Sequence, residues 1–146
     1  GFAQWLTDGS GFLTLTADNE GNAAVNVFKL DGSTPLLRLT PGSQSDTLVA
    51  LSPDGRWVVT SSKGEAGDAV NLFRMKLDGS GRESITKFTL SEQDQTITGL
   101  VWGLDGIYYS LSTSSDQTET TFRVDLDGAN PASVAVGTLY RIVGAP

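Results

Sequence analysis

The sequence predicts an all-β protein, a β-propeller fragment built from three four-stranded antiparallel blades. The first observation is a repeated turn signal, Asp-Gly, which recurs at a spacing of roughly 50 residues. A second signal, Leu-Asp-Gly, recurs at about the same spacing. Between these turns lie short segments rich in β-branched and aromatic residues, which are typical of strands. Repeats of this length with strands between them favour an architecture of small sheets.

The first two strands of each repeat flank the first turn signal. An apolar segment enters the turn at residues 2–7, 48–53 and 99–104, and Trp5, Leu51 and Trp102 hold the same position in it. In the second repeat Pro53 precedes Asp54-Gly55, which predicts a type I turn closed by a glycine with positive φ. The second strand follows at residues 12–15, 57–60 and 107–111.

The last two strands flank the second turn signal. Alternate apolar residues, such as Phe73, Met75 and Leu77, run into each Leu-Asp-Gly and give the third strand one apolar face. The fourth strand is expected at residues 36–40, 85–89 and 132–136. No segment shows a convincing helical period, so no long helix is predicted.

A four-stranded meander with apolar residues on both faces must be covered on both sides. Radial stacking of such sheets gives a propeller, and the alternative is a β-sandwich of about twelve strands. The regular repeat favours the propeller. We expect one partial propeller over residues 1–146, with blades at about 1–43, 44–93 and 94–138 and the start of a further strand at 139–146.

Composition excludes several classes of function. The net charge is −7 and the ten basic residues are scattered, which argues against binding to nucleic acid. The chain has no Cys and no His, so thiol chemistry, Cys-based zinc sites and a Ser-His-Asp triad are excluded. No stretch approaches the length of apolar residues that a membrane span needs. No cofactor is expected.

The second repeat resembles a known family. Ser52-Pro53-Asp54-Gly55-Arg56-Trp57, followed by the segment 70–79 that ends in Met75-Lys76-Leu77-Asp78-Gly79, is similar to the TolB-like, WD40-like (PD40) propeller repeat. Arg38-Leu39-Thr40 is similar to the Arg-Leu-Thr ending of that repeat. The third copy departs from the pattern, because Gly103-Leu104 replaces Ser-Pro.

The resemblance implies a non-catalytic scaffold for protein–protein interaction in the bacterial envelope, periplasmic or extracellular. Family propellers have more blades than this chain, so we expect a fragment of a larger propeller. The open faces would then be covered by remaining blades of the same protein, by a second copy or by another partner. One alternative is the gating propeller of a prolyl-oligopeptidase or dipeptidyl-peptidase-like hydrolase, whose catalytic domain would lie elsewhere. Another is a metal-dependent lactonase, which the absence of His disfavours.

Candidate site residues fall into two groups. The loops between second and third strands are acidic, and they are the candidate surface for a basic protein partner: Asp18, Glu20, Glu65, Asp68, Asp116 and Glu119. The turn residues are assigned a structural role: Asp8, Gly9, Asp31, Gly32, Asp54, Gly55, Asp78, Gly79, Asp105, Gly106, Asp127 and Gly128. No catalytic residue and no metal ligand is assigned, and Trp5 and Trp102 are expected to pack between blades.

Overall fold

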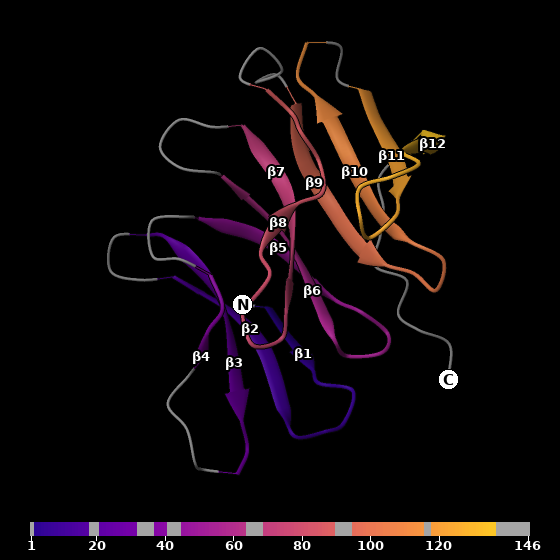
Figure 1. Ribbon diagram of the computed structural model, residues 1–146. Helices are drawn as coiled ribbons and strands as arrows, with labels where there is room; N and C mark the ends of the chain where they lie inside the picture. Colours follow the sequence, from indigo (N-terminus) through magenta and orange to yellow (C-terminus); the bar gives the residue numbers. More distant parts are fainter. Residues whose placement is uncertain are drawn as a thin grey trace.

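Three separate antiparallel sheets make up the protein. The computed structural model describes residues 2–17, 21–31, 37–40, 45–63, 69–89, 95–115 and 118–136, and all regular structure in these ranges is strand. Twelve strands form three four-stranded meanders in the orders β1-β2-β3-β4, β5-β6-β7-β8 and β9-β10-β11-β12 (Figure 1). The predicted all-β fold with three blades is confirmed. No helix long and apolar enough to cross a membrane occurs in the described ranges.

The strands differ in length across each blade. The first blade contains β1 (Phe2–Trp5), β2 (Gly11–Ala17), β3 (Ala23–Lys29) and β4 (Leu37–Arg38). The second contains β5 (Asp46–Leu51), β6 (Trp57–Lys63), β7 (Val70–Lys76) and β8 (Glu83–Ser84). The third contains β9 (Gln95–Trp102), β10 (Ile107–Thr113), β11 (Thr118–Val124) and β12 (Ala132–Val136).

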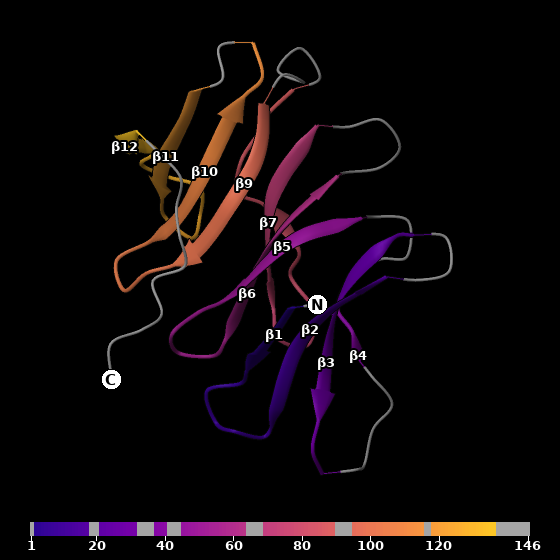
Figure 2. The ribbon, with the colours of Figure 1, turned by 180° about the vertical axis from the view of Figure 1, so that it is seen from behind.

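The three blades lie side by side in sequence order, which both views show (Figures 1 and 2). The first strands of the second and third blades, β5 and β9, contact one another, and β5 also contacts β2 and β3 of the first blade. The hairpins that join β1 to β2, β5 to β6 and β9 to β10 lie toward the same end of the molecule (Figure 1). The far ends of β2, β6 and β10 therefore point to the opposite end, as the strand order requires.

Two apolar cores lie between the sheets. The core between the first two blades joins residues such as Leu13, Val25 and Val27 to Val58 and Met75. The core between the second and third blades joins residues such as Val59 and Leu72 to Ile107, Tyr109 and Val124. Each core takes side chains from two blades, so a blade buries its apolar residues only against its neighbours.

The fourth strand of the second blade lies upstream of its predicted position. We expected it at 85–89, but β8 covers only Glu83–Ser84. The last backbone bond to β7 runs from the Ile85 N–H to the Leu72 carbonyl at 2.8 Å, and side chains replace the ladder beyond it. The Thr86 hydroxyl accepts a hydrogen bond from the Leu72 backbone N–H at 2.9 Å, and Asn71 Oδ1 accepts one from the Phe88 backbone N–H at 2.7 Å. These bonds satisfy the buried backbone without a regular strand.

The first hairpin of the third blade is shorter than those of the other two. Ile107 pairs with Trp102, and the backbone N–H of Gly103 bonds the carbonyl of Gly106 at 2.9 Å, so Leu104 and Asp105 form the turn. In the second blade, by contrast, the Ser52 N–H reaches the carbonyl of Trp57. Gly106 does not have the positive φ found at Gly55, because in this shorter turn it lies outside the two turn residues.

Candidate functional site

The Asp-Gly turns are held by their own aspartates. The Oδ1 atom of Asp8 accepts a hydrogen bond from the Ser10 backbone N–H at 2.9 Å, and Asp78 accepts the equivalent bond from Ser80 at 2.9 Å. Asp54 accepts bonds from the Ser52 hydroxyl at 2.6 Å and the Arg56 backbone N–H at 3.1 Å. These carboxylates are local structural elements of the turns.

Hydrogen bonds to the turn carboxylates also lower their pKa values. Bonds from Ser52 and then from the Arg56 backbone lower the pKa of Asp54 to about 2, and bonds from Ser10 and Ser80 lower the pKa of Asp8 and Asp78. All three groups stay ionised at neutral pH. A general acid needs a raised pKa, so their environment favours the structural role.

The aspartates of the remaining turns have different hydrogen-bond donors. Asp127 accepts a bond from the Ala129 backbone N–H at 2.9 Å, and Gly128 has φ +83°. Asp105 instead accepts bonds from the Tyr108 hydroxyl at 3.0 and 3.1 Å. Asp31 is exposed, and Gly32 lies outside the described residues.

Most of the predicted acidic loop surface lies outside the described residues. This applies to Asp18, Glu20, Glu65, Asp68 and Asp116. Glu119 is described, and it belongs to the strand β11 rather than to a loop. Its carboxylate accepts a short hydrogen bond from the hydroxyl of Thr98 on β9. In the described ranges no three His, Cys, Asp or Glu side chains gather as metal ligands would.

Four apolar positions recur on one face of every blade, and we call each set a leading stripe because in the second and third blades it faces the preceding blade. Strand pairing aligns Trp5 with Phe12 and Phe28, Leu51 with Val58 and Met75, and Trp102 with Ile107 and Val124. The fourth member is the Leu of each Leu-Asp-Gly. The stripes are Trp5, Phe12, Phe28 and Leu30; Leu51, Val58, Met75 and Leu77; and Trp102, Ile107, Val124 and Leu126.

The leading stripes differ in burial. Val58, Met75 and Ile107 are fully buried between blades. In the first blade Trp5 is 64% exposed, Phe28 40% and Leu30 54%. Trp102 packs against the core between the second and third blades, as expected, whereas Trp5 is exposed in this chain. The difference lies in the neighbour, because no sheet in the described ranges lies in front of β1.

Polar contacts also cross between blades. The Nη1 atom of Arg74 on β7 donates to the carbonyl of Leu126 in the third blade at 3.0 Å, while its Nη2 atom pairs with Glu83 at 2.6 Å. Asp46 on β5 is fully buried and accepts a bond from the Val25 N–H of the first blade at 3.3 Å. Burial lowers the pKa of Arg82, and nearby Asp46 opposes that shift.

Glycines permit the close contact of successive blades. A Cβ on Gly128 would lie 2.6 Å from the carbonyl oxygen of Ile85, and one on Gly79 would lie 3.2 Å from that of Leu39. Leu39 and Ile85 lie in the last segment of their own blades. Each stands directly before the threonine that accepts a hydrogen bond from the third strand of that blade. The Leu-Asp-Gly turn of one blade therefore packs on the last segment of the blade before it, which gives this motif a second role.

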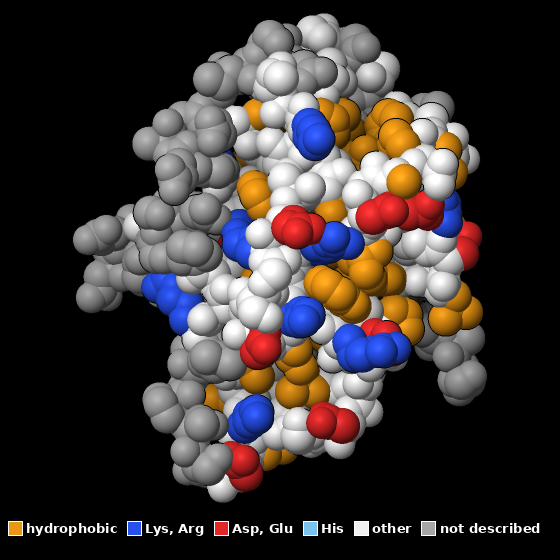
Figure 3. Space-filling view, viewed as in Figure 1, with side chains coloured by type: hydrophobic (Ala, Val, Ile, Leu, Met, Phe, Trp, Pro, Cys, Tyr) orange, Lys and Arg blue, Asp and Glu red, His pale blue; other side chains and the backbone are white. Residues whose placement is uncertain are grey.

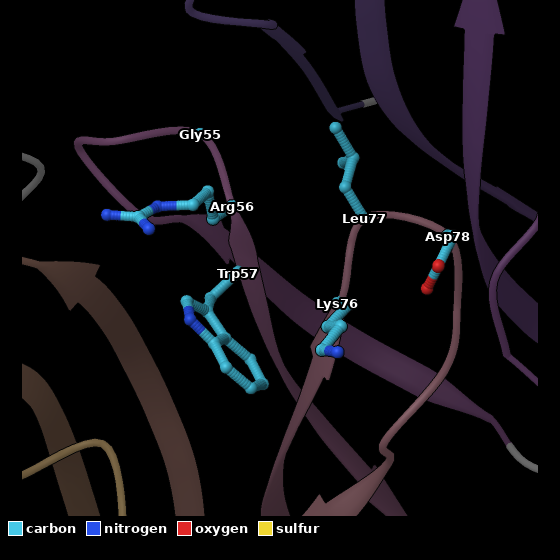
Figure 4. A pocket seen from close by; sticks show the side chains of 6 residues that line it. All are labelled: Gly55, Arg56, Trp57, Lys76, Leu77 and Asp78. Carbon is cyan, nitrogen blue, oxygen red and sulfur yellow. The ribbon is translucent and has the colours of Figure 1, made fainter.

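A concave site that sequence analysis missed lies at the tight-turn end of the second blade. It has a volume of about 490 Å³. Figure 4 shows its six lining residues, which come from two neighbouring turns and the strand ends beside them: Gly55, Arg56, Trp57, Lys76, Leu77 and Asp78. Arg74 lies 5.4 Å from the centre of the Trp57 ring. The available signal was Arg56 next to Trp57 at one turn, together with Lys76 at the following turn.

A second cavity of about 490 Å³ lies between the second and third blades. Its walls include Lys87, Phe88, Tyr109 and Asp127. Over the face in Figure 3, basic and acidic side chains alternate around apolar areas and form no continuous patch of one sign. This distribution agrees with the exclusion of a nucleic-acid surface on that face.

Known structures share this fold. No family model matches the chain, and no curated protein matches it. A protein assigned as TolB from Agrobacterium tumefaciens superposes with a TM-score of 0.75 at 21% identity, over 92% of this chain and 49% of that chain. A chain of a nidogen–laminin complex superposes with a TM-score of 0.66 at 15% identity, over 94% of this chain and 48% of that one.

The chain thus spans about half the length of the solved structures it matches. The likeness extends over nearly the whole chain, and the three meanders have the strand order of propeller blades. The chain therefore has the fold of three blades of a β-propeller.

Proposed function

We propose that this chain is part of a larger TolB-like propeller and serves as a non-catalytic scaffold for protein–protein interaction. One observation carries the first half of this proposal. Trp5, Phe28 and Leu30 are exposed in the first blade, whereas their counterparts Leu51 and Met75 are buried by the preceding sheet. A propeller with further blades would bury that face in the same way.

The chemistry of the described residues supports a binding role. The chain has no His or Cys, and the turn carboxylates that accept hydrogen bonds from Ser10, Ser52 and Ser80 are held ionised. The serine hydroxyls that donate to Asp8 and Asp54 have no histidine to act as their general base, because the chain contains none. A scaffold needs no such arrangement, because loops on rigid sheets suffice for recognition.

The partner surface is proposed at the end of the molecule opposite the tight turns. The adjoining ends of β2 and β3, of β6 and β7 and of β10 and β11 lie there, and the sequences between these strands carry five of the six acidic candidates. A basic protein of the bacterial envelope, periplasmic or extracellular, fits this charge. Within this surface, Glu65 and Asp68 provide two carboxylates in one loop.

Site-specific photocrosslinking tests the scaffold proposal. A photoreactive phenylalanine analogue is placed at Ser115, next to the acidic loop of the third blade, and as a control at Leu104, which is 97% exposed at the tight-turn end. The captured protein is identified by mass, purified and titrated against the wild-type chain. We expect capture from Ser115, and a Kd at least about 10-fold weaker for Glu65→Lys with Leu104→Lys unchanged.

Two results would contradict the scaffold. One is capture from Leu104 alone. The other is reaction of the natural protein that contains this chain with a fluorophosphonate serine-hydrolase probe. The second result would support the gating propeller of a hydrolase instead.

A further inference from the structure

The exposed leading stripe of the first blade is an ordered aromatic surface. Trp5 contacts Phe12 edge to face, with ring centres 6.0 Å apart, and Phe12 stacks on Phe28 at 5.0 Å. Leu30 extends the same face beyond the end of β3. An apolar surface of this kind on a stable protein marks an interaction site.

The two internal interfaces show what fits such a face. In each of them the leading stripe is covered by the sheet of the preceding blade, as Val58 and Met75 are covered by Val25 and Val27. The opposite face of a blade, which we call the trailing face, supplies this cover. The occupant expected at Trp5, Phe12 and Phe28 is therefore the trailing face of another blade.

The third blade carries a trailing face of this type. Strand pairing places Tyr108 and Arg123 at the positions that Val59 and Arg74 hold in the second blade. Arg74 donates across the interface to the carbonyl of Leu126, in the Leu-Asp-Gly of the next blade. Arg123 pairs with Asp105 and Asp125 of its own blade through Nε and Nη2. By the same equivalence, the acceptor that corresponds to Leu126 for Arg123 is the carbonyl of Leu30, in the Leu-Asp-Gly of a first blade.

We infer that two copies of this chain associate head to tail, with the leading stripe of each first blade against the trailing face of the other copy's third blade. This inference rests on the proposal that the chain is part of a larger propeller, and it names the partner as a second copy. Two contacts related by a twofold axis close a ring of six blades, which leaves neither face open.

The exposed side chains of the first blade favour this arrangement. A closed pair buries two blade faces on each copy, and the leading face brings the exposed side chains of Trp5, Phe28 and Leu30 into contact. Large aromatic side chains at the centre of a contact contribute most of the affinity.

Sedimentation over a range of concentrations tests this inference. The wild-type chain is expected to form a dimer that dissociates on dilution. Trp5→Asp is expected to weaken dimerisation at least about 100-fold, because it places a charge in the apolar contact. The matched control is Leu104→Asp, which changes a side chain that is 97% exposed in a turn and is expected to dimerise as the wild type does. Circular dichroism confirms that each variant is folded.

A mixing experiment tests the head-to-tail geometry. Trp5→Asp and Tyr108→Asp each disable one face, so each alone is expected to be monomeric under conditions where the wild type is a dimer. Their mixture retains one intact contact and is expected to form a heterodimer. If the leading stripes instead paired with one another, Tyr108→Asp alone would dimerise normally.

Several results would overturn the inference. They are a wild-type chain that stays monomeric at high concentration, open-ended oligomers in place of a dimer, or dimerisation unaffected by Trp5→Asp. A longer natural protein that is monomeric and protects Trp5 from acrylamide quenching would assign this face to blades of the same polypeptide, and it would also overturn the second copy as occupant. None of these results depends on the photocrosslinking partner, so the scaffold and the dimer fail separately.

Discussion

The first and second blades carry the same apolar stripe in different surroundings. In the second blade Leu51, Val58 and Met75 are packed against the first blade, and their exposed fractions are 4%, 0% and 0%. In the first blade Trp5 and Phe28 occupy equivalent positions and are 64% and 40% exposed. The pairing register is the same in both, so the sheet itself does not account for the difference.

This comparison teaches that a blade is an incomplete unit of stability. Each sheet contributes half of a core, and the other half comes from the next sheet. The energetic value of a stripe residue therefore depends on its neighbour more than on its own strand. Equivalent substitutions in different blades are therefore expected to change the free energy of unfolding by different amounts.

The largest effect is expected where the stripe is covered. Met75→Ala empties a fully buried position between the first two blades, which we expect to lower the free energy of unfolding by about 3 kcal/mol. Phe28→Ala, at the equivalent open position, is expected to cost roughly 1 kcal/mol in the monomer, because mainly the contact with Phe12 is lost. Urea unfolding of dilute protein measures both, and equal losses would contradict the comparison.

The glycine turns give the next contrast. Gly128 has φ +83°, and an added Cβ would approach the Ile85 carbonyl to 2.6 Å; Gly9 has φ +70° with nothing within 4 Å of such a Cβ. Gly9→Ala is expected to lower the free energy of unfolding by about 1 kcal/mol, because only the positive φ is unfavourable for alanine there. Gly128→Ala also forces two blades apart, for a total of about 2–3 kcal/mol. Thermal unfolding compares them, and a larger loss for Gly9→Ala would contradict this account.

The threonines at the outer edges of the blades give a smaller contrast. Thr86→Val leaves the buried Leu72 N–H without its 2.9 Å acceptor, and we expect a loss of about 2 kcal/mol. Thr40→Val removes the equivalent 3.1 Å acceptor of the Val25 N–H, but Asp46 Oδ2 remains at 3.3 Å, so about 1 kcal/mol is expected. Hydrogen exchange of the two amides measures the difference. Faster exchange at Val25 than at Leu72 in the respective variants would contradict it.

The smallest effect is a pH dependence in the exposed turn at Asp54. Its pKa falls from 3.8 to about 2 on folding, so the carboxylate stabilises the folded chain above the higher value and this contribution is lost as pH falls through the lower one. The difference in urea midpoint between wild type and Asp54→Asn is expected to shrink over that range. Ser52→Ala removes the main donor and is expected to reduce the same pH dependence. A difference that stays constant down to pH 2 would contradict the assignment.

Much of the fold could be predicted because short-range chemistry determines it. Asp8 and Asp78 bond the backbone two residues later, so their turns depend on few residues and leave a clear sequence pattern. The apolar alternation at Met75 and Leu77 likewise follows from strand geometry. The number of strands and their antiparallel order could therefore be derived from the sequence, and the likeness to known propellers agrees with them.

The features that were missed depend on contacts distant in the sequence. Thr86 and Asn71 replace a strand ladder at the edge of the second blade, so the expected strand at 85–89 is shifted. The third Asp-Gly pair lies in a shorter hairpin, although its letters match those of the other two copies. Trp5 shares its position with Trp102, but its burial depends on a sheet that the sequence pattern cannot place.

The candidate surfaces show the same division. The acidic loops could be named from composition, since loop polarity is local. The contact from Arg74 to Leu126 and the concave site around Trp57 depend on how two turns or two blades approach each other. The equivalent positions of Arg74 and Arg123 were a usable signal, because an arginine repeated within a strand facing the next blade indicates an interface.

Thiol labelling tests most directly the claim that equivalent stripe positions differ only in their neighbours. The chain has no cysteine, so Phe28→Cys, Met75→Cys and Val124→Cys each introduce one thiol at the same position of successive blades. In dilute native protein the thiol at position 28 is expected to react at least about 100-fold faster than those at 75 and 124, which must wait for the blades to open. Equal rates at all three positions would contradict the account.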